Sequence, residues 1–268
     1  MKKFNGLLLF SDLDGTLFDD NTEIPERNEK GISYFISEGG LFSIGTGRSH
    51  YSLERYYERL GINAPCVTQN GCCVFDYRTH EFLENVFLNE TAKKAACGIY
   101  GEFADLNVVQ FVESGLVVLR DPDSLNPCFD AKFVPVQTGR PEASEVPWFK
   151  VGFVGPMERL SCLRSELEKI DLEGAEIVYT GTDMLEVLPA GVSKGTGMLS
   201  VAKRLGIERQ NICAIGDFHN DLEMIENAGI GAAVEGAPEE LKNLASFIAC
   251  DCNSGSVGHF IEWLDERF

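Results

Sequence analysis

The sequence has 268 residues, enough for one large domain or two of moderate size. Hydrophobic residues make up 44% of it and charged residues 24%, a balance that allows a sizeable core and excludes collagen-like, coiled-coil and wholly disordered chains. The 23 Lys and Arg against 42 Asp and Glu give a net charge of −19, and so acidic a surface repels phosphate backbones and anionic lipids. We therefore expect neither a nucleic-acid partner nor a membrane partner.

The nine cysteines are too sparse for a disulfide scaffold, and their number is odd. Cys72 and Cys73 are adjacent and Cys250-x-Cys252 has no second pair, so the sequence lacks zinc-ligand spacing. The apolar run of residues 7–10 is too short for a signal peptide or a membrane span. We expect reduced thiols in a soluble cytoplasmic protein that is a monomer or a small homo-oligomer.

Residues 1–80 alternate between strand and helix patterns. Short apolar runs predict buried strands over residues 7–11, 41–44 and 66–68. Apolar residues at helical spacing predict helices around residues 32–36 and 53–60. Ser49 is a candidate cap of the second helix, Gly61 a candidate end, and Asn70-Gly71 is typical of a tight turn.

From about residue 81 to about residue 187 the pattern changes, because strand-like runs follow one another closely. They lie at residues 108–112, 116–119, 149–154, 177–179 and 184–188. Helices are expected over residues 89–103 and 159–170, and the Pro-, Gly- and polar-rich stretch 135–147 predicts an exposed loop. We interpret this segment as an inserted α+β domain.

Residues 188–268 again alternate between strand and helix patterns, as residues 1–80 do. Strands are expected over residues 212–215, 230–234 and 247–249, and helices around 198–205, 222–225 and 260–264, with Pro238 at the start of one more. Alternating strands and helices predict an α/β fold with a doubly wound parallel sheet. The expected organisation is a core of residues 1–80 and 188–268 with a cap domain of residues 81–187.

Asp12 and Asp14 directly follow the first expected strand. Residues two apart in extended chain point to the same side, so both carboxylates are expected at the carboxyl end of the strand, where open α/β sheets place their ligands. Two such close carboxylates repel each other unless a cation or a shared proton relieves them, and Mg²⁺ would do so. The alternative is a plain turn and helix cap.

A second acidic cluster, Asp217, Asn220 and Asp221, follows the strand of residues 212–215. If Asp217 opens a helix, the other two side chains share its face. Asp217 would then complete a magnesium site, with Asn220 and Asp221 holding its waters or a phosphate. An acidic helix cap is the alternative.

Two further candidates are suited to phosphate. Gly45-Thr46-Gly47-Arg48 follows the second strand, and a small turn that opens a helix offers backbone N–H groups and a hydroxyl to an anion. It lacks the third glycine of the dinucleotide fingerprint, and an ordinary strand-to-helix turn is the alternative. Lys194 would be a point charge for a phosphoryl group, although a lone lysine is usually a solvated surface residue.

Together these motifs resemble those of the haloacid dehalogenase superfamily of phosphatases, and within it the Cof-like sugar-phosphate phosphatases. The resemblance is carried by Asp12-Leu13-Asp14-Gly15-Thr16, Thr46-Gly47-Arg48, Lys194 and Gly216-Asp217-x-x-Asn220-Asp221. It implies a large α+β cap between the second and third motifs. The cap segment itself shows no motif, so the resemblance does not carry over a particular substrate.

The resemblance also implies a Mg²⁺-dependent phosphatase that acts on a small phosphorylated metabolite, with sugar phosphates as the expected class. Asp12 would attack phosphorus to form an aspartyl phosphate, and Asp14 would act as acid and base. Mg²⁺ would be held around Asp12, Asp14, Asp217 and Asp221. The implied phosphate-binding residues are Leu13, Thr46, Gly47, Arg48, Lys194 and Asn220.

Other activities stay open on the sequence alone. Sugar phosphomutases share this core and cap type, and a non-catalytic phosphometabolite-binding regulator would keep the pocket without turnover. Gly191-Val192-Ser193-Lys194-Gly195 also fits the nucleophile elbow of an esterase, with Asp217 and His259 in the expected chain order. The elbow requires sheet strands before Ser193, where the expected cap lies, so we disfavour this interpretation.

Overall fold

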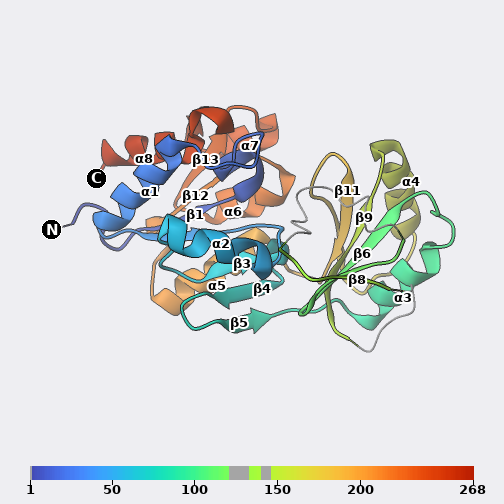
Figure 1. The fold of residues 1–268 in the computed structure, drawn as a ribbon. Coiled ribbons are helices and arrows are strands. Elements are labelled where there is room, and N and C mark those ends of the chain that lie inside the picture. The colour runs from blue at the N-terminus through green and yellow to red at the C-terminus, as the bar shows by residue number, and fades with distance from the viewer. Residues whose placement is uncertain (1, 121–132, 140–145) are drawn as a thin grey trace.

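The computed structural model describes residues 2–120, 133–139 and 146–268. Two bodies lie side by side (Figure 1). The first contains both chain ends, drawn in blue and red, and the second contains the middle of the chain, drawn in green and yellow. This arrangement confirms the expected α/β core with an inserted cap.

A five-stranded parallel sheet forms the centre of the core, in the order β14-β13-β12-β1-β2. Its strands are β1 (Leu8–Ser11), β2 (Leu41–Ile44), β12 (Ile212–Gly216), β13 (Ile230–Val234) and β14 (Phe247–Ala249). β1 lies between β2 and β12, with Leu8 opposite Leu41 and Ile212. The carboxyl ends of these three strands therefore meet at one edge, as the sequence predicts.

Helices cover both faces of this sheet. On one face lie α1 (Glu26–Ser37), α2 (His50–Leu60) and α8 (Ser256–Asp265), which pack in one apolar cluster with Leu9 of β1. On the other lie α5 (Lys194–Leu205), α6 (Leu222–Asn227) and α7 (Glu239–Leu244), which pack with Leu8 and Phe10. Successive side chains of β1 thus serve opposite layers, which explains its uninterrupted apolar sequence.

A three-stranded antiparallel sheet extends the core. It consists of β3 (Cys66–Thr68), β4 (Cys73–Asp76) and β5 (Glu81–Asn85). β3 was expected, but a single bridge between Gly45 and Val67 joins it to β2 in place of a full ladder. β4 and β5 were not predicted. Because β5 pairs with β4, we propose that the cap begins after residue 85 rather than at residue 81.

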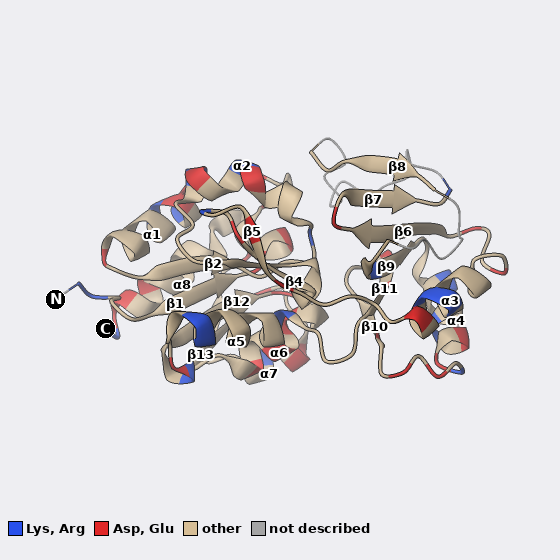
Figure 2. Cartoon of the chain, turned by 90° about the horizontal axis from the view of Figure 1, so that it is seen from below, with Lys and Arg blue, Asp and Glu red and all other residues tan. Residues whose placement is uncertain are grey.

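The cap contains a six-stranded sheet in the order β10-β11-β9-β6-β7-β8. Its strands are β6 (Asn107–Val112), β7 (Gly115–Val118), β8 (Val136–Thr138), β9 (Trp148–Val154), β10 (Glu176–Tyr179) and β11 (Met184–Leu188). Helices α3 (Glu90–Ile99) and α4 (Met157–Leu167) cover the face turned away from the core (Figure 1). Figure 2 shows that these helices carry many of the charged residues of the cap, whereas β6 to β8 carry few.

One expectation for the cap was wrong. Residues 135–147 were predicted as an exposed loop, but Val136–Thr138 form β8, which pairs in parallel with β7. The pairing, rather than the side chains, stabilises this strand, since Gln137 and Thr138 are exposed. The rest of the predicted loop lies mainly at residues 140–145, outside the described residues.

Candidate active site

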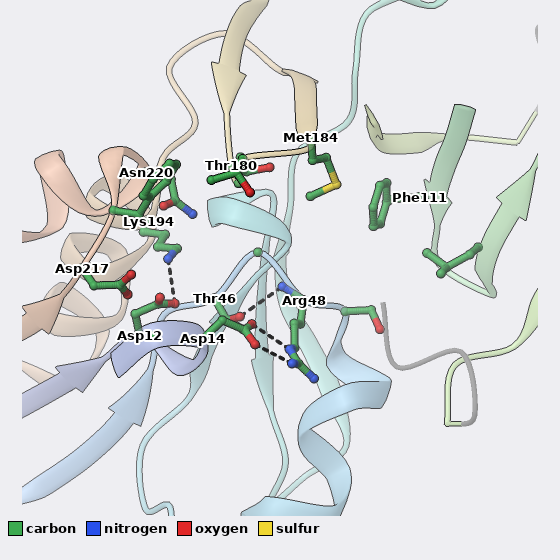
Figure 3. A pocket seen from close by; sticks show the side chains of 17 residues that line it. Asp12, Asp14, Thr46, Arg48, Phe111, Thr180, Met184, Lys194, Asp217 and Asn220 are labelled. Carbon is green, nitrogen blue, oxygen red and sulfur yellow. Dashed lines mark hydrogen bonds and ion pairs between the residues drawn. The ribbon is translucent and has the colours of Figure 1, made fainter. Parts of the chain in front are cut away.

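A cavity of about 270 Å³ opens between the carboxyl edge of the parallel sheet and the inner face of the cap sheet. In Figure 3, Asp12, Asp14, Lys194 and Asp217 approach this space from the core, and Phe111, Thr180 and Met184 face it from the cap. The core side also includes Gly15, Thr46, Gly47, Arg48, Ser49, Phe218 and Asn220, and the cap side Leu116, Gly181 and Thr182. The four predicted motifs therefore share one cavity.

Asp12 lies at the end of β1, and its N–H continues the sheet by donating to the Ile215 carbonyl at 3.0 Å. The chain then turns through Leu13–Leu17, and the Thr16 hydroxyl donates to Asp217 Oδ1 at 2.7 Å. Gly15 is required here because its φ is +75° and a Cβ would lie 2.5 Å from Asp217 Oδ2. These contacts hold the first motif, around Asp12, against the fourth motif, around Asp217.

Lys194 is a buried cation rather than a mobile surface lysine. It is the first residue of α5, and Ser193 caps this helix by accepting from the Thr196 N–H. Its Nζ lies 2.7 Å from Asp12 Oδ1 and 2.7 Å from Asp221 Oδ1. Burial opposes the charge, but these two carboxylates outweigh it and raise the pKa of Lys194, so the ammonium stays protonated.

Asp221 contacts both Lys194 and the backbone of the loop that carries Asp217. It is fully buried, and its second oxygen accepts from the N–H groups of Asp217 and Phe218 at 3.0 and 3.1 Å. Both oxygens of Asp221 are therefore engaged, one by Lys194 and one by the backbone. This geometry favours Asp221 as the residue that orients Lys194 and the Asp217 loop.

The carboxylates of Asp12, Asp217 and Asp221 offer oxygens that all lie within 4.8 Å of one another. Burial, followed by repulsion from Asp221, raises the pKa of Asp12 well above its ordinary value and that of Asp217 to about 7. Among the described residues, no hydrogen bond reaches the second oxygen of Asp12 or of Asp217. Two free oxygens in a crowded acidic site fit a hard divalent cation.

Asp14 has different surroundings. Its oxygens accept from Arg48 Nε at 2.8 Å and from Arg48 Nη2 at 2.5 Å, and its side chain is 41% exposed. Arg48 is itself buried, and its guanidinium lies over the Phe18 ring. The sequence placed Arg48 among the phosphate-binding residues, whereas here a bidentate pair holds Asp14 at the cavity.

The remaining predicted phosphate-binding residues lie around the same edge. Thr46 is buried and its hydroxyl accepts from the Arg48 N–H at 3.1 Å, which shapes the turn after β2. The side chain of Leu13 is buried in the core, so only its backbone is available to a ligand. Ser49 precedes α2 as expected, but its buried hydroxyl makes no capping bond and finds no partner among the described residues.

Asn70 could face the cleft on the sequence alone, but a turn residue was the preferred interpretation, and the structure places its side chain against residues of the site. It does occupy a turn, with a φ of 58°, yet its side chain is buried. Its Oδ1 accepts from Asn220 Nδ2 at 3.1 Å, and its N–H donates to the Thr46 carbonyl at 2.9 Å. The only sequence signal is an Asn-Gly pair after a strand, which is typical of many turns.

The esterase interpretation does not match the geometry. The Ser193 hydroxyl caps α5 and hydrogen-bonds Glu223. His259 lies in α8, where Nδ1 accepts from the Cys250 N–H at 2.9 Å. His219, 46% exposed, lies 3.7 Å from Glu240. These side chains therefore have structural or surface roles.

The fold and the site define a capped α/β enzyme whose centre is a buried aspartate paired with a lysine. A family model described as haloacid dehalogenase-like hydrolase matches residues 9–261. The chain belongs to this family.

Named relatives extend over nearly the whole chain. A 5-amino-6-(5-phospho-D-ribitylamino)uracil phosphatase of Bacillus subtilis is 27% identical and aligns with 94% of this chain and 96% of its own. An HMP-PP phosphatase of Cronobacter sakazakii is also 27% identical, over 95% and 94% of the two chains. These relatives are phosphatases.

The fold is shared with the solved structure of a haloacid dehalogenase subclass IIB sugar phosphatase. The TM-score is 0.84, with 21% sequence identity and coverage of 96% of this chain and 98% of the other. Separately, no helix in the described part of the chain has the length and apolar character needed to cross a bilayer.

Proposed function

We propose that the protein is a Mg²⁺-dependent phosphatase that hydrolyses a small phosphorylated metabolite through an aspartyl phosphate on Asp12. The observation that carries this proposal is the buried Asp12 carboxylate at the cavity, held through one oxygen by Lys194 and leaving the other free. The phosphatase activity in the names of the relatives supports it. A mere binding protein has no need of both a nucleophile and a separate acid.

In the proposed first step, the free oxygen of Asp12 forms a bond to phosphorus while the bond to the ester oxygen breaks. Asp14, held by Arg48, gives the leaving oxygen a proton. In the second step Asp14 takes a proton from water, whose oxygen attacks phosphorus and releases phosphate and free Asp12. Lys194 offsets charge in both steps.

The phosphoryl oxygens would be bound by the N–H groups of Leu13 and Gly47, by Thr46, by Lys194 and by Asn220. Bound Mg²⁺ would neutralise charge on the transferring group. Asp12, the Asp14 carbonyl and Asp217 would hold the ion, with Asp221 behind them. In this assignment Arg48 acts on phosphate only through Asp14, since its guanidinium faces that carboxylate.

The residues on the cap side of the cavity indicate which class of substrate would fit. Phe111, Leu116 and Met184 present apolar surface there, next to Thr180 and Thr182. Sugar phosphates are the class implied by the resemblance, and the apolar surface supports adding phosphate esters that carry an aromatic ring. The same proposal includes a monomer or small homo-oligomer and a cytoplasmic location, and the free thiols of the eight described cysteines support the location.

A phosphate-release screen tests the proposal. The purified protein, first treated with chelator, would be assayed with sugar phosphates, nucleotides and cofactor phosphates, with and without Mg²⁺. We expect release only with Mg²⁺ and none from Asp12→Asn. Phosphate release without a bisphosphorylated activator would decide for hydrolysis, whereas isomerised product without phosphate release would indicate the mutase. Full turnover without metal would contradict the proposed site.

A further inference from the structure

The inner face of the cap sheet contains a buried ion pair that no predicted motif includes. Lys150 of β9 and Glu186 of β11 are both 0% exposed, and Nζ lies 2.6 Å from Oε1. Burying two charges costs free energy that their attraction seldom exceeds, and an apolar pair of similar volume is often as stable. Stability alone therefore does not account for this pair.

Each member of the pair makes a second hydrogen bond, and both of these bonds cross to the core. Lys150 Nζ donates to the Gly47 carbonyl at 2.9 Å. The other oxygen of Glu186 accepts from Asn70 Nδ2 at 2.7 Å. The ion pair thus contacts two turns of the core. Lys150 bonds Gly47 in the turn after β2, and Glu186 bonds Asn70 in the turn after β3.

Asn70 connects Glu186 to two of the proposed phosphate-binding residues, Asn220 and Gly47. Its Oδ1 accepts from Asn220, and its amide lies against Gly47, where a Cβ would come within 3.0 Å of Asn70 Oδ1. Gln69 and Asn70 both have φ near +55°, an uncommon conformation for residues other than glycine, and Gln69 N–H donates to the Arg48 carbonyl at 2.9 Å. The surrounding bonds are what keep this turn in place.

None of the three residues is among the described residues that line the cavity. Lys150 and Asn70 instead contact residues that do line it, since Lys150 bonds Gly47 and Asn70 bonds Asn220. The geometry points to Lys150 and Glu186 as positioning residues that, with the cap against the core, fix Gly47 and, through Asn70, Asn220. This inference rests on the proposed function, in which Gly47 and Asn220 bind the transferring phosphoryl group.

The test alters the contact between cap and core from both sides, at Asn70 in the core and at the Lys150–Glu186 pair in the cap. Asn70→Gly keeps the positive φ and removes the amide. Glu186→Gln leaves the Lys150 ammonium buried without its partner, so the double variant Lys150→Met/Glu186→Gln is made alongside it. Asp105→Asn, which breaks an exposed ion pair with Arg159 on the cap, is the matched control.

We expect about a tenfold or greater fall in kcat and a similar weakening of inorganic phosphate binding in Asn70→Gly and in the double variant, because small misplacements of binding groups are costly. Asp105→Asn should match the wild type. Combining Asn70→Gly with the double variant should give less than the sum of the two effects, since both weaken the contact between Glu186 and Asn70, while only the double variant also loses the Lys150 bond to Gly47. A structural role would instead lower the melting temperature and give additive effects.

The inference is overturned if the folded variants keep kcat and phosphate affinity within twofold of the wild type, or if their effects add. Phosphate binding, followed by calorimetry in the presence of Mg²⁺, separates this outcome from failure of the proposed function. A wild type without phosphatase activity would refute that function, and equal phosphate affinity in wild type and Asn70→Gly would refute the positioning role.

Discussion

At the scale of single residues, the two aspartates of the first motif lie in contrasting surroundings. Asp12 is buried and bonded to a buried lysine, whereas Asp14 is partly exposed and held by an arginine. A nucleophile benefits from a fixed position and an uncommitted oxygen, while a proton carrier needs access to water and to the leaving group. The two environments match the two proposed roles.

Replacing each aspartate by asparagine distinguishes these roles. Asp12→Asn should form no phosphoenzyme on any substrate. Asp14→Asn should slow alkyl esters by about 10²–10⁴-fold, because an alkoxide leaving group needs a proton. An aryl phosphate needs little protonation, so its phosphoenzyme should accumulate and be visible by intact mass. Equal slowing of aryl and alkyl substrates without a trapped intermediate would contradict the role of Asp14.

The Arg48–Asp14 pair gives a second prediction. Arg48→Lys retains the charge but not the two-point contact, so Asp14 should lose its fixed orientation. We expect kcat for an alkyl phosphate to fall by about tenfold or more, and kcat for an aryl phosphate to fall less. Arg59→Lys, which alters a pair with Glu29 on the surface, is the control and should leave both unchanged. Equal losses for the two substrates would argue that Arg48 acts on phosphate itself.

At the scale of elements, the acidic edge formed by β1 and β12 predicts a metal requirement. Burial and neighbouring carboxylates raise the pKa values of Asp12 and Asp217, and a dication would relieve that repulsion. Asp217→Ala should raise the Mg²⁺ concentration for half-maximal activity by about tenfold or more, because one ligand is lost. The control is Asp265→Ala, at a partly exposed carboxylate that pairs with Lys3. An unchanged Mg²⁺ titration in Asp217→Ala would rule out this ligand.

The first residue of α2 makes stability depend on pH. Burial lowers the pKa of His50 to about 4 from its ordinary 6.5. As pH falls through about 6.5 the unfolded chain gains a proton that the folded chain does not, so stability is lost between about pH 6.5 and pH 4. The loss by about pH 4.5 is about 2 kcal/mol.

His50→Phe should lack this part of the acid sensitivity. Between about pH 7.5 and pH 4.5, its free energy of unfolding should fall by about 2 kcal/mol less than that of the wild type, measured by urea denaturation. His80→Asn, at an exposed position, should follow the wild type. If His50→Phe and the wild type lose equal stability, His50 is not the titrating group.

The sequence predicted those elements whose signals are local. Every strand of the parallel sheet was found from its apolar run, and the four motifs were located because each directly follows a strand or begins a helix. β8 was missed since its three residues are stabilised by pairing with β7 and carry no apolar pattern. Asn70, Lys150 and Glu186 acquire their roles through contacts between residues more than 100 positions apart, which no local pattern encodes.

At the scale of the whole molecule, the cap provides one wall of the cavity, which would face the leaving group in the proposed mechanism. Met184→Ala should raise KM for substrates with a ring by about tenfold, because a buried apolar side chain contributes about 1–3 kcal/mol to binding. A small substrate such as acetyl phosphate should be unaffected. Met157→Ala, on α4, is the control. An unchanged substrate ranking would count against the cap wall as a source of specificity.

The pairing of β1 with β12 has a consequence for biosynthesis. Leu8 lies opposite Ile212, so the central strand finds one neighbour only after some 200 further residues have been made. At ribosomal speeds this takes roughly 10–40 s, during which β1 offers an unpaired edge to other chains. The strands and helices of the cap are continuous in sequence and are all made during this interval, whereas Asp12 and Asp217 meet only after Ile212–Gly216 has emerged. The acidic cluster at the end of β1 can therefore assemble in a nascent chain only after residues 212–221 have been made.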